Sequence, residues 1–137
     1  MRVLSILLVL LVGCSPNVPQ EDLHLLNGYW EIEKVSLPNG ETKDFMSSTT
    51  IDYIELDGMK GFRKKVQPKF NGTFETSNDA ELFTIVQNGE GFDLNYKGST
   101  NSWSEKLMSI SKDNFSVTNQ DSMTYGYKRY EPMHLNQ

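Results

Sequence analysis

Two glutamates on one predicted strand have the spacing that best suits acid–base chemistry. Glu31 and Glu33 stand two positions apart, so an extended strand would project both side chains from one face, roughly 7 Å apart. Paired carboxylates near this separation perform acid and base steps in some hydrolases. Such pairs more often solvate an outer sheet face, and the serines lack a Gly-x-Ser-x-Gly elbow and a histidine partner. We therefore expect no catalytic residue and no enzyme activity.

The two histidines are the next candidates for site chemistry. His24 and His134 lie outside the predicted strands, near the two ends of the folded region. A zinc site needs three or four converging ligands, and the sequence places no such set around either histidine. We expect both to be surface residues, and we expect no metal and no cofactor.

Cys14 is the only cysteine, and it ends an apolar run. Residues 3–12 are apolar except for Ser5 and follow a single cation, Arg2, which is the layout of a secretory signal. A helix of that length would span about 15 Å, half of a bilayer, so we do not expect a permanent transmembrane segment. A lone thiol cannot form an intramolecular disulfide.

The stretch Leu11-Val12-Gly13-Cys14 resembles the lipobox of bacterial lipoprotein precursors. The resemblance implies a signal peptide over residues 1–13 and a Cys14 thiol linked to diacylglycerol, with a further fatty acid such as palmitate on the new amino group. It also implies attachment to the membrane of a bacterial cell envelope, and Ser15 is compatible with the outer membrane. The alternative is an ordinary signal peptide with a chance cysteine.

The charge balance of the chain bounds its partners. With 13 basic and 18 acidic side chains the net charge is −5, and loss of Arg2 would make it more negative. A net acidic domain is unsuited to general nucleic-acid binding. One segment is basic, either as a charged edge strand or as a face for membrane phosphates or an acidic partner; its cations are Lys60, Arg63, Lys64, Lys65 and Lys69.

Turn signals and alternation predict an antiparallel β fold. Dipeptides that favour tight turns occur at Asn27-Gly28, Asn39-Gly40, Asp57-Gly58, Asn71-Gly72 and Asn88-Gly89. Apolar side chains alternate between them, as at Phe92, Leu94 and Tyr96. We predict no helix, and strands over 28–37, 50–57, 60–67, 70–76, 80–88, 90–97, 101–111, 113–119 and 122–131. The apolar parity changes between Leu107 and Met108, which predicts a bulge or a sharp bend.

Eight or nine short strands joined by tight turns predict an all-β fold, an antiparallel up-and-down β-barrel, because closure hides the sheet edges. A two-sheet sandwich is the rival, but only residues 38–49 offer a connection long enough for a crossover. Residues 14–26 would hold the lipidated cysteine and a tether. The barrel domain would cover 27–131, followed by a tail over 132–137.

The first and last strands of the predicted barrel resemble those of lipocalins and lipocalin-like proteins. Gly28-Tyr29-Trp30 gives a Gly-x-Trp motif at the start of the first strand, and Arg129 ends the last strand. The stretch from Trp103 into the tyrosine-rich end looks like the closing half of small lipocalin-like lipoproteins from Gram-negative bacteria. The resemblance implies that Gly28, Trp30 and Arg129 close one end of the barrel.

The aromatic side chains decide between two non-catalytic roles. If the strands splay at the open end, an apolar pocket for a small hydrophobic ligand would be lined by Phe83, Phe92, Tyr96, Trp103, Phe115, Tyr125 and Tyr127. If the rings fill the barrel, the domain would be a protein-interaction or structural module of the envelope. Separately, Asp121-Ser122-Met123 in a predicted turn resembles a short O-glycosylation motif, with Ser122 as the acceptor.

Overall fold

The computed structural model describes residues 17–45, 50–76 and 79–131. A short 3-10 helix, η1 (Gln20–Leu26), precedes ten strands. Their bounds are β1 (Gly28–Ser36), β2 (Thr42–Asp44), β3 (Ile51–Asp57), β4 (Lys60–Pro68), β5 (Phe74–Thr76), β6 (Glu81–Asn88), β7 (Gly91–Lys97), β8 (Ser102–Ile110), β9 (Asn114–Asn119) and β10 (Thr124–Arg129).

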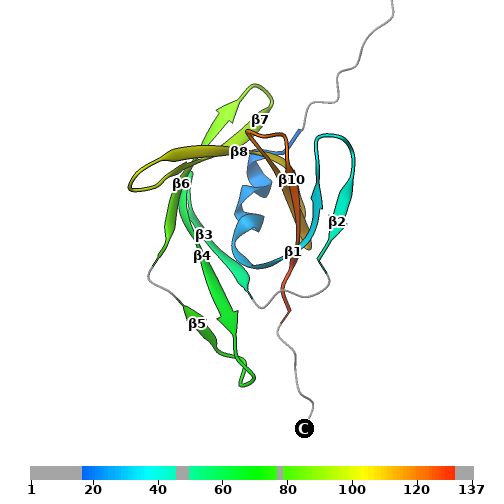
Figure 1. Ribbon diagram of the computed structural model, residues 1–137. Helices are drawn as coiled ribbons and strands as arrows, with labels where there is room; N and C mark the ends of the chain where they lie inside the picture. The colour runs from blue at the N-terminus through cyan, green and yellow to red at the C-terminus, as the bar shows by residue number, and fades with distance from the viewer. Residues whose placement is uncertain (1–16, 46–49, 77–78, 132–137) are drawn as a thin grey trace, which may run out of the picture.

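Eight of these strands close into an antiparallel barrel in the order β1, β3, β4, β6, β7, β8, β9 and β10 (Figure 1). Closure comes from pairing of the last strand with the first, which sets Trp30 opposite Arg129. The predicted all-β up-and-down barrel is thereby confirmed, and the two-sheet sandwich is excluded. The two short strands lie outside the ring, with β2 paired to the end of β1 and β5 paired to the end of β4.

The barrel has a closed end and an open end. At the closed end lie η1, the start of β1, the end of β10 and the turns that follow β3, β6 and β8. The turns that follow β4, β7 and β9 lie at the open end. In Figure 1 the blue helix η1 lies within the ring of strands, where it plugs the closed end.

Residues 18–26 belong to the folded domain, although the sequence led us to expect a tether there and no helix. Val18, Leu23 and Leu26 are buried in the same core as the barrel strands. Leu23 and Leu26 are three positions apart, the repeat of a 3-10 helix, so both face the barrel interior. One such repeat is too short to stand out as helical periodicity in the sequence. The expected tether therefore ends before Val18.

Four of the five predicted glycine turns form between strands, and Gly40, Gly58, Gly72 and Gly89 all have positive φ there. Gly28 has another role, because it begins β1 directly after η1 with a φ of 127°. A Cβ at this position would lie 2.5 Å from Nη1 of Arg129. Glycine is therefore needed here for the close approach of the arginine and for the backbone conformation.

The strands agree with the predicted ranges within a few residues, with two exceptions. Most of the range 70–76 is the β4–β5 turn, in which the backbone N–H of Lys69 donates to the carbonyl of Thr73. Only Phe74–Thr76 is strand. β2 was not predicted, because its three residues are all exposed and show no alternation. The bulge in β8 is confirmed by a register shift between Leu107 and Ser109.

Candidate functional site at the open end of the barrel

Two adjacent strands carry charged side chains into the barrel interior. Asp52 on β3 and Arg63 on β4 are only 3 % and 7 % exposed. Arg63 Nη2 lies 2.5 Å from Asp52 Oδ2, and Lys65 Nζ lies 2.5 Å from Asp52 Oδ1. Two cations thus share one carboxylate, which leaves one positive charge in excess within this group.

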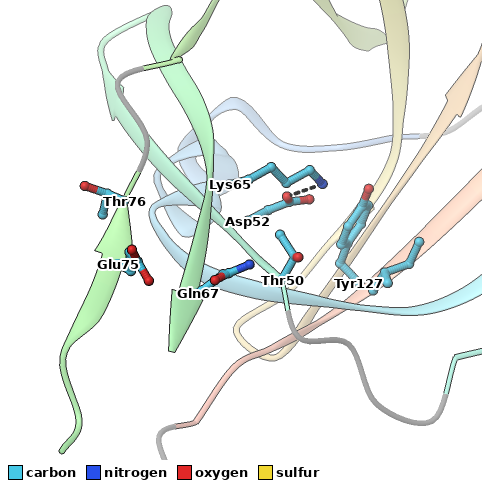
Figure 2. A pocket seen from close by; sticks show the side chains of 8 residues that line it. Thr50, Asp52, Lys65, Gln67, Glu75, Thr76 and Tyr127 are labelled. Atoms are coloured by element: carbon cyan, nitrogen blue, oxygen red, sulfur yellow. Dashed lines mark ion pairs between the residues drawn. The ribbon is translucent and has the colours of Figure 1, made fainter. Parts of the chain in front are cut away.

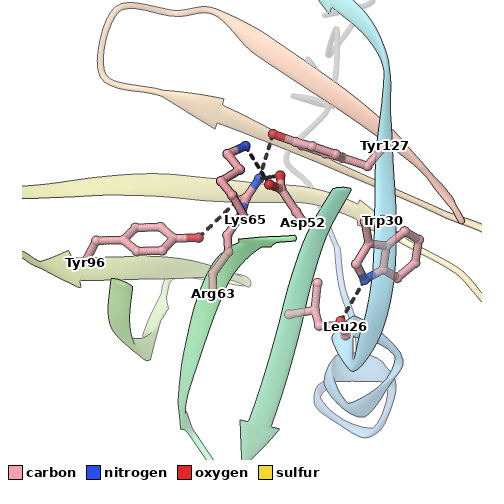
Figure 3. A network of polar contacts seen from close by, with 7 residues as sticks. All are labelled: Leu26, Trp30, Asp52, Arg63, Lys65, Tyr96 and Tyr127. Atoms are coloured by element: carbon pink, nitrogen blue, oxygen red, sulfur yellow. Dashed lines mark hydrogen bonds and ion pairs between the residues drawn. The ribbon is translucent and has the colours of Figure 1, made fainter. Parts of the chain in front are cut away.

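Two phenol groups complete the buried network (Figure 3). Arg63 Nη1 donates to Tyr96 Oη at 3.2 Å, and Arg63 Nη2 donates to Tyr127 Oη at 2.7 Å. The guanidinium carbon also lies 4.9 Å from the centroid of the Tyr127 ring. These contacts offset the cost of burying a cation, and they join β3, β4, β7 and β10 through one side chain.

The network changes the acidity of its members. Burial raises the pKa of Asp52, but the neighbouring Arg63 and Lys65 outweigh burial and hold that pKa below its ordinary value of 3.8. Burial raises the pKa of Tyr96 to about 12 and also raises the pKa of Tyr127, in both cases against the opposing effect of Arg63. At neutral pH the carboxyl is therefore ionised, and both phenols keep their hydrogen.

Glu105 on β8 faces the same network without joining it. Burial raises the pKa of its carboxyl, and the nearby positive charge of Arg63 only partly opposes this effect. Within the described part of the chain the carboxyl of Glu105 makes no hydrogen bond and no ion pair. Its charged form is therefore poorly supported inside the barrel.

A recess of about 690 Å³ opens beside the network at the open end. Figure 2 shows the side chains of Asp52 and Lys65 close together, with Tyr127 on one side of them and Thr50 and Gln67 nearby. We call Asp52, Lys65 and Tyr127 the floor of the recess, because Asp52 and Tyr127 are buried there. The full lining is Ile32, Thr50, Asp52, Lys65, Gln67, Glu75, Thr76 and Tyr127.

The recess exists because two pairs of strands separate toward the open end. β1 pairs with β3 only as far as Trp30, and its end pairs with β2 instead. β4 pairs with β6 only as far as Arg63, and its end pairs with β5. A second recess of about 240 Å³ between β4 and β6 shares Asp52 and Lys65 with the first, and is also lined by Arg63, Lys64, Asp79, Glu81, Trp103 and Glu105.

The closed end holds the three residues that the family resemblance placed there. The guanidinium carbon of Arg129 lies 4.1 Å from the centroid of the Trp30 ring. Its three nitrogens donate to the backbone carbonyls of Lys112, Asn27 and Leu25. Trp30 Nε1 donates to the carbonyl of Leu26 at 2.8 Å. Arg129 thus fastens η1 to the barrel, next to the glycine that makes room for it.

The seven aromatic residues expected around a ligand pocket lie in or against one hydrophobic cluster. Phe83, Phe92 and Phe115 are buried, and the Phe115 ring stacks on Tyr127 and meets Trp30 edge-on. Trp103 and Tyr125 are half-buried against the same cluster. Of the seven, Tyr127 lines the larger recess and Trp103 the smaller one. Most of the set therefore fills the barrel, and most of the residues that line the larger recess are polar or charged.

The other candidates from the sequence do not assemble into a site. A bulge between Ile32 and Lys34 interrupts the regular spacing that would have paired Glu31 with Glu33. His24 is exposed, with Nδ1 2.6 Å from the carbonyl of Glu21. No group of three or more metal-binding side chains occurs among residues 17–45, 50–76 and 79–131. Cys14 and His134 lie outside these ranges.

The basic segment is neither a continuous cationic face nor a charged edge. Arg63 points into the barrel, Lys65 contacts Asp52, and the first half of β4 pairs with strands on both sides. Ser122 is exposed in the β9–β10 turn with a φ of 61°. In the described part of the chain, no helix has the length and apolar character needed to cross a membrane.

Sequence reasoning missed Asp52 and the inward role of Arg63. The signal was alternation across charged residues, because Asp52 and Ile54 share one face of β3, and Ile54 is opposite Arg63 in the β3–β4 register. An inward aspartate beside an inward arginine on the neighbouring strand is the pattern of a buried ion pair.

Comparison with known proteins gives likenesses of structure alone. No protein-family model matches the chain, and no curated protein matches it. Among solved structures, lobster apocrustacyanin A1 is similar with a TM-score of 0.48 and 7% identity, over 84% of this chain and 66% of that one. Apocrustacyanin C1 is similar with a TM-score of 0.46 and 6% identity, over 82% and 64%. The chain spans about two thirds of the length of these structures.

Proposed function

We propose that this protein is a non-catalytic, lipocalin-like binding protein, anchored in the bacterial cell envelope by lipid on Cys14, that holds a small amphiphilic molecule at its open end. The recess of about 690 Å³ carries the proposal. Its volume lies in the range of small-molecule sites, and it combines the apolar side chain of Ile32 and the ring of Tyr127 with the charges of Asp52 and Lys65.

The charged floor changes the ligand expected from the sequence. A purely hydrophobic molecule would remove water from Asp52 and Lys65 without replacing their hydrogen bonds, which is costly. The closed half of the barrel is filled by Trp30, Phe115 and Leu26, so an apolar tail has no room below the floor. The proposed ligand is therefore an amphiphile with its polar end at the floor and its apolar part toward the mouth.

The proposed anchor would orient the barrel. Residues 14–17 extend at most about 14 Å before the buried Val18. Gln20 and Glu21 of η1 lie beside Gly58 and Met59 of the β3–β4 turn, at the closed end. A lipid on Cys14 would then hold the closed end near the membrane and direct the mouth away from it. The ligand would enter from the aqueous side.

The ligand proposal is tested by native mass spectrometry of full-length protein extracted from its own membrane. We expect a bound small molecule on the wild-type chain. Gln67→Trp, which places a large ring in the recess, should lose it. Gln87→Trp is the matched control, because Gln87 is exposed on β6 away from the recess, and it should keep the bound molecule. A wild-type chain with nothing bound, or Gln67→Trp with the molecule retained, contradicts the proposal.

The anchoring proposal is tested separately in the same extracts. The mature wild-type chain should begin at Cys14 and carry the mass of a diacylglycerol group and an amide-linked fatty acid. Cys14→Ser should lose this mass and leave the membrane fraction. Mature protein that remains in the membrane fraction without the acyl mass overturns the anchor and leaves the ligand proposal standing.

A protein-interaction role is the second candidate, and one side chain favours it. Phe70, at the tip of the β4–β5 turn beside the mouth, is 97 % exposed. Large aromatic side chains are enriched among the residues that dominate protein interfaces. If this role holds, Phe70→Ser should remove a cross-linked partner in membrane extracts while the bound small molecule is unchanged. An unaltered cross-linking pattern contradicts it.

A further inference from the structure

We propose that the recess binds its ligand through an oxyanion, such as a carboxylate or a phosphate group, that points inward onto Lys65 and Tyr127. This inference rests on the proposed function and names the ligand class of the same site. We argue it from the hydrogen-bonding groups of the floor, by asking which of them already have a partner and which are free.

The acceptors of the floor are paired. Oδ2 of Asp52 accepts a hydrogen bond from Arg63, and Oδ1 of the same carboxylate forms an ion pair with Lys65. A ligand that offered a donor to Asp52 would have to displace a charged partner from a nearly buried carboxylate. Because such charge-assisted bonds are among the strongest in proteins, that exchange is unfavourable.

The free capacity of the floor consists of donors. The ammonium group of Lys65 has three N–H bonds, and its ion pair with Asp52 is its only polar contact among residues 17–45, 50–76 and 79–131. The side chain of Lys65 is 68 % exposed, so the remaining donors can be reached from the recess. The oxygen of Tyr127 accepts from Arg63, which leaves its O–H hydrogen without an acceptor among those same residues.

The charge of the floor has the matching sign. Arg63 and Lys65 together exceed Asp52 by one positive charge. Arg63 acts from a nearly buried position where charges are weakly screened, and Lys65 adds its charge from the exposed side of the same carboxylate. Glu75 is the opposing charge on the recess wall, but it is exposed at the rim, where water and salt weaken its effect. Glu105 lies beyond the network and lines the smaller recess.

The three observations together select the head group. An oxyanion accepts several hydrogen bonds at once and would receive them from both Lys65 and Tyr127. A neutral hydroxyl would use fewer of these donors, and an ammonium group would face Arg63 and Lys65 with the same charge. The apolar part of the ligand would then run past Ile32 toward the mouth.

Titration calorimetry of the full-length protein in lipid nanodiscs tests this inference, with empty nanodiscs as the blank. The probes are octanoate, octyl phosphate, octanol and octylammonium, which share one tail. We expect both anions to bind at least about tenfold more tightly than octanol, a ratio typical of one charge-assisted hydrogen bond. Octylammonium should bind no better than octanol. The ratio of octanoate to octyl phosphate affinity distinguishes a carboxylate ligand from a phosphate ligand.

Three variants locate the binding. Lys65→Met and Tyr127→Phe should each weaken anion binding by about five- to tenfold, the effect expected for the loss of one such bond. Lys64→Met is the matched control, because Lys64 points outward toward Tyr53 and Phe62, and it should bind octanoate as the wild type does. Circular dichroism checks that each variant is folded. If Lys65→Met does not fold, Tyr127→Phe still tests the inference.

The outcomes separate the inference from the function on which it rests. Octanol or octylammonium binding as tightly as octanoate overturns the oxyanion but supports an amphiphile site. Unchanged octanoate affinity in both Lys65→Met and Tyr127→Phe also overturns the oxyanion. Failure of all four probes to bind overturns the oxyanion and the amphiphile site together.

Discussion

Arg63 and Asp52 form an ion pair inside the barrel, with Nη2 and Oδ2 2.5 Å apart and both side chains nearly buried. Such a pair adds little stability compared with well-packed apolar residues, because both charges lose their hydration. Removing one partner has a different effect. If Asp52 is the partner removed, Arg63 stays in a poorly solvated interior, where it forms no other ion pair within residues 17–45, 50–76 and 79–131.

The first prediction concerns the loss of that carboxylate. Asp52→Asn keeps the shape of the side chain but leaves Arg63 and Lys65 without their shared anion, so we expect a loss of about 3–5 kcal/mol in the free energy of unfolding. Urea unfolding followed by circular dichroism measures it. Asp57→Asn, at the exposed end of the same strand, is the control and should change stability by less than about 0.5 kcal/mol. Similar losses in both variants contradict the buried pair.

The same variant has a defined pH dependence. Because the pKa of Asp52 is lowered on folding, its contribution to stability is fully present above the ordinary value of 3.8 and is lost as pH falls through the lower folded value. The difference between wild type and Asp52→Asn should therefore stay constant from about pH 7 to pH 5 and shrink below about pH 4. A difference that grows toward acid contradicts the assignment.

The second prediction concerns Glu105, whose pKa moves the other way. Burial makes its carboxyl harder to ionise in the folded protein, so the ionised group lowers stability as pH rises past its ordinary value of 4.5. Glu105→Gln should therefore be more stable than wild type at pH 7, and the gain should vanish below about pH 4. Thermal unfolding at several pH values measures this. Glu55→Gln, on an exposed position of β3, should show no such gain.

The contrast between Asp52 and Glu105 shows why the barrel could be predicted from the sequence and the site could not. Alternation and glycine turns depend on local spacing, and they correctly predicted closure, most strands and the bulge after Leu107. The site depends on which strands separate. The departure of β4 from β6 after Arg63 and of β1 from β3 after Trp30 is set by long-range pairing, which leaves no local signal.

The charged residues added a second difficulty. A lysine-rich segment normally covers a solvated face, so Arg63 was grouped with its neighbours on the chain. Its partners Tyr96 and Tyr127 lie 33 and 64 residues away. The helix η1 was missed for a related reason, since two leucines three apart give one helical turn and no longer pattern.

The third prediction concerns the contacts of Arg129 at the closed end. Arg129→Ala removes the contact with the Trp30 ring and three hydrogen bonds to backbone carbonyls, so we expect a loss of about 1–3 kcal/mol in the free energy of unfolding. Lys128→Ala is the control, because Lys128 is exposed on the outer face of the same strand. The two variants are compared by their urea unfolding midpoints. An unchanged midpoint in Arg129→Ala counts against a stabilising role of Arg129.

The fourth prediction tests whether η1 is part of the folded domain or only a tether. Leu26 is fully buried and belongs to the core cluster of the barrel. Leu26→Ala should therefore lower the free energy of unfolding by about 2–5 kcal/mol, the usual cost of a cavity in a packed core. Leu82 is 62 % exposed on β6, and Leu82→Ala should change it by less than about 0.5 kcal/mol.

The two leucines make the comparison strict, because the chemical change is the same and only the surroundings differ. If residues 18–26 were a tether, as the sequence suggested, both variants would have the same urea unfolding midpoint as the wild type. A selective loss in Leu26→Ala would instead mean that the barrel is complete only with η1 inserted in its closed end. In that case a lipid anchor on Cys14 would lie only a few residues before Val18, which is part of the hydrophobic core.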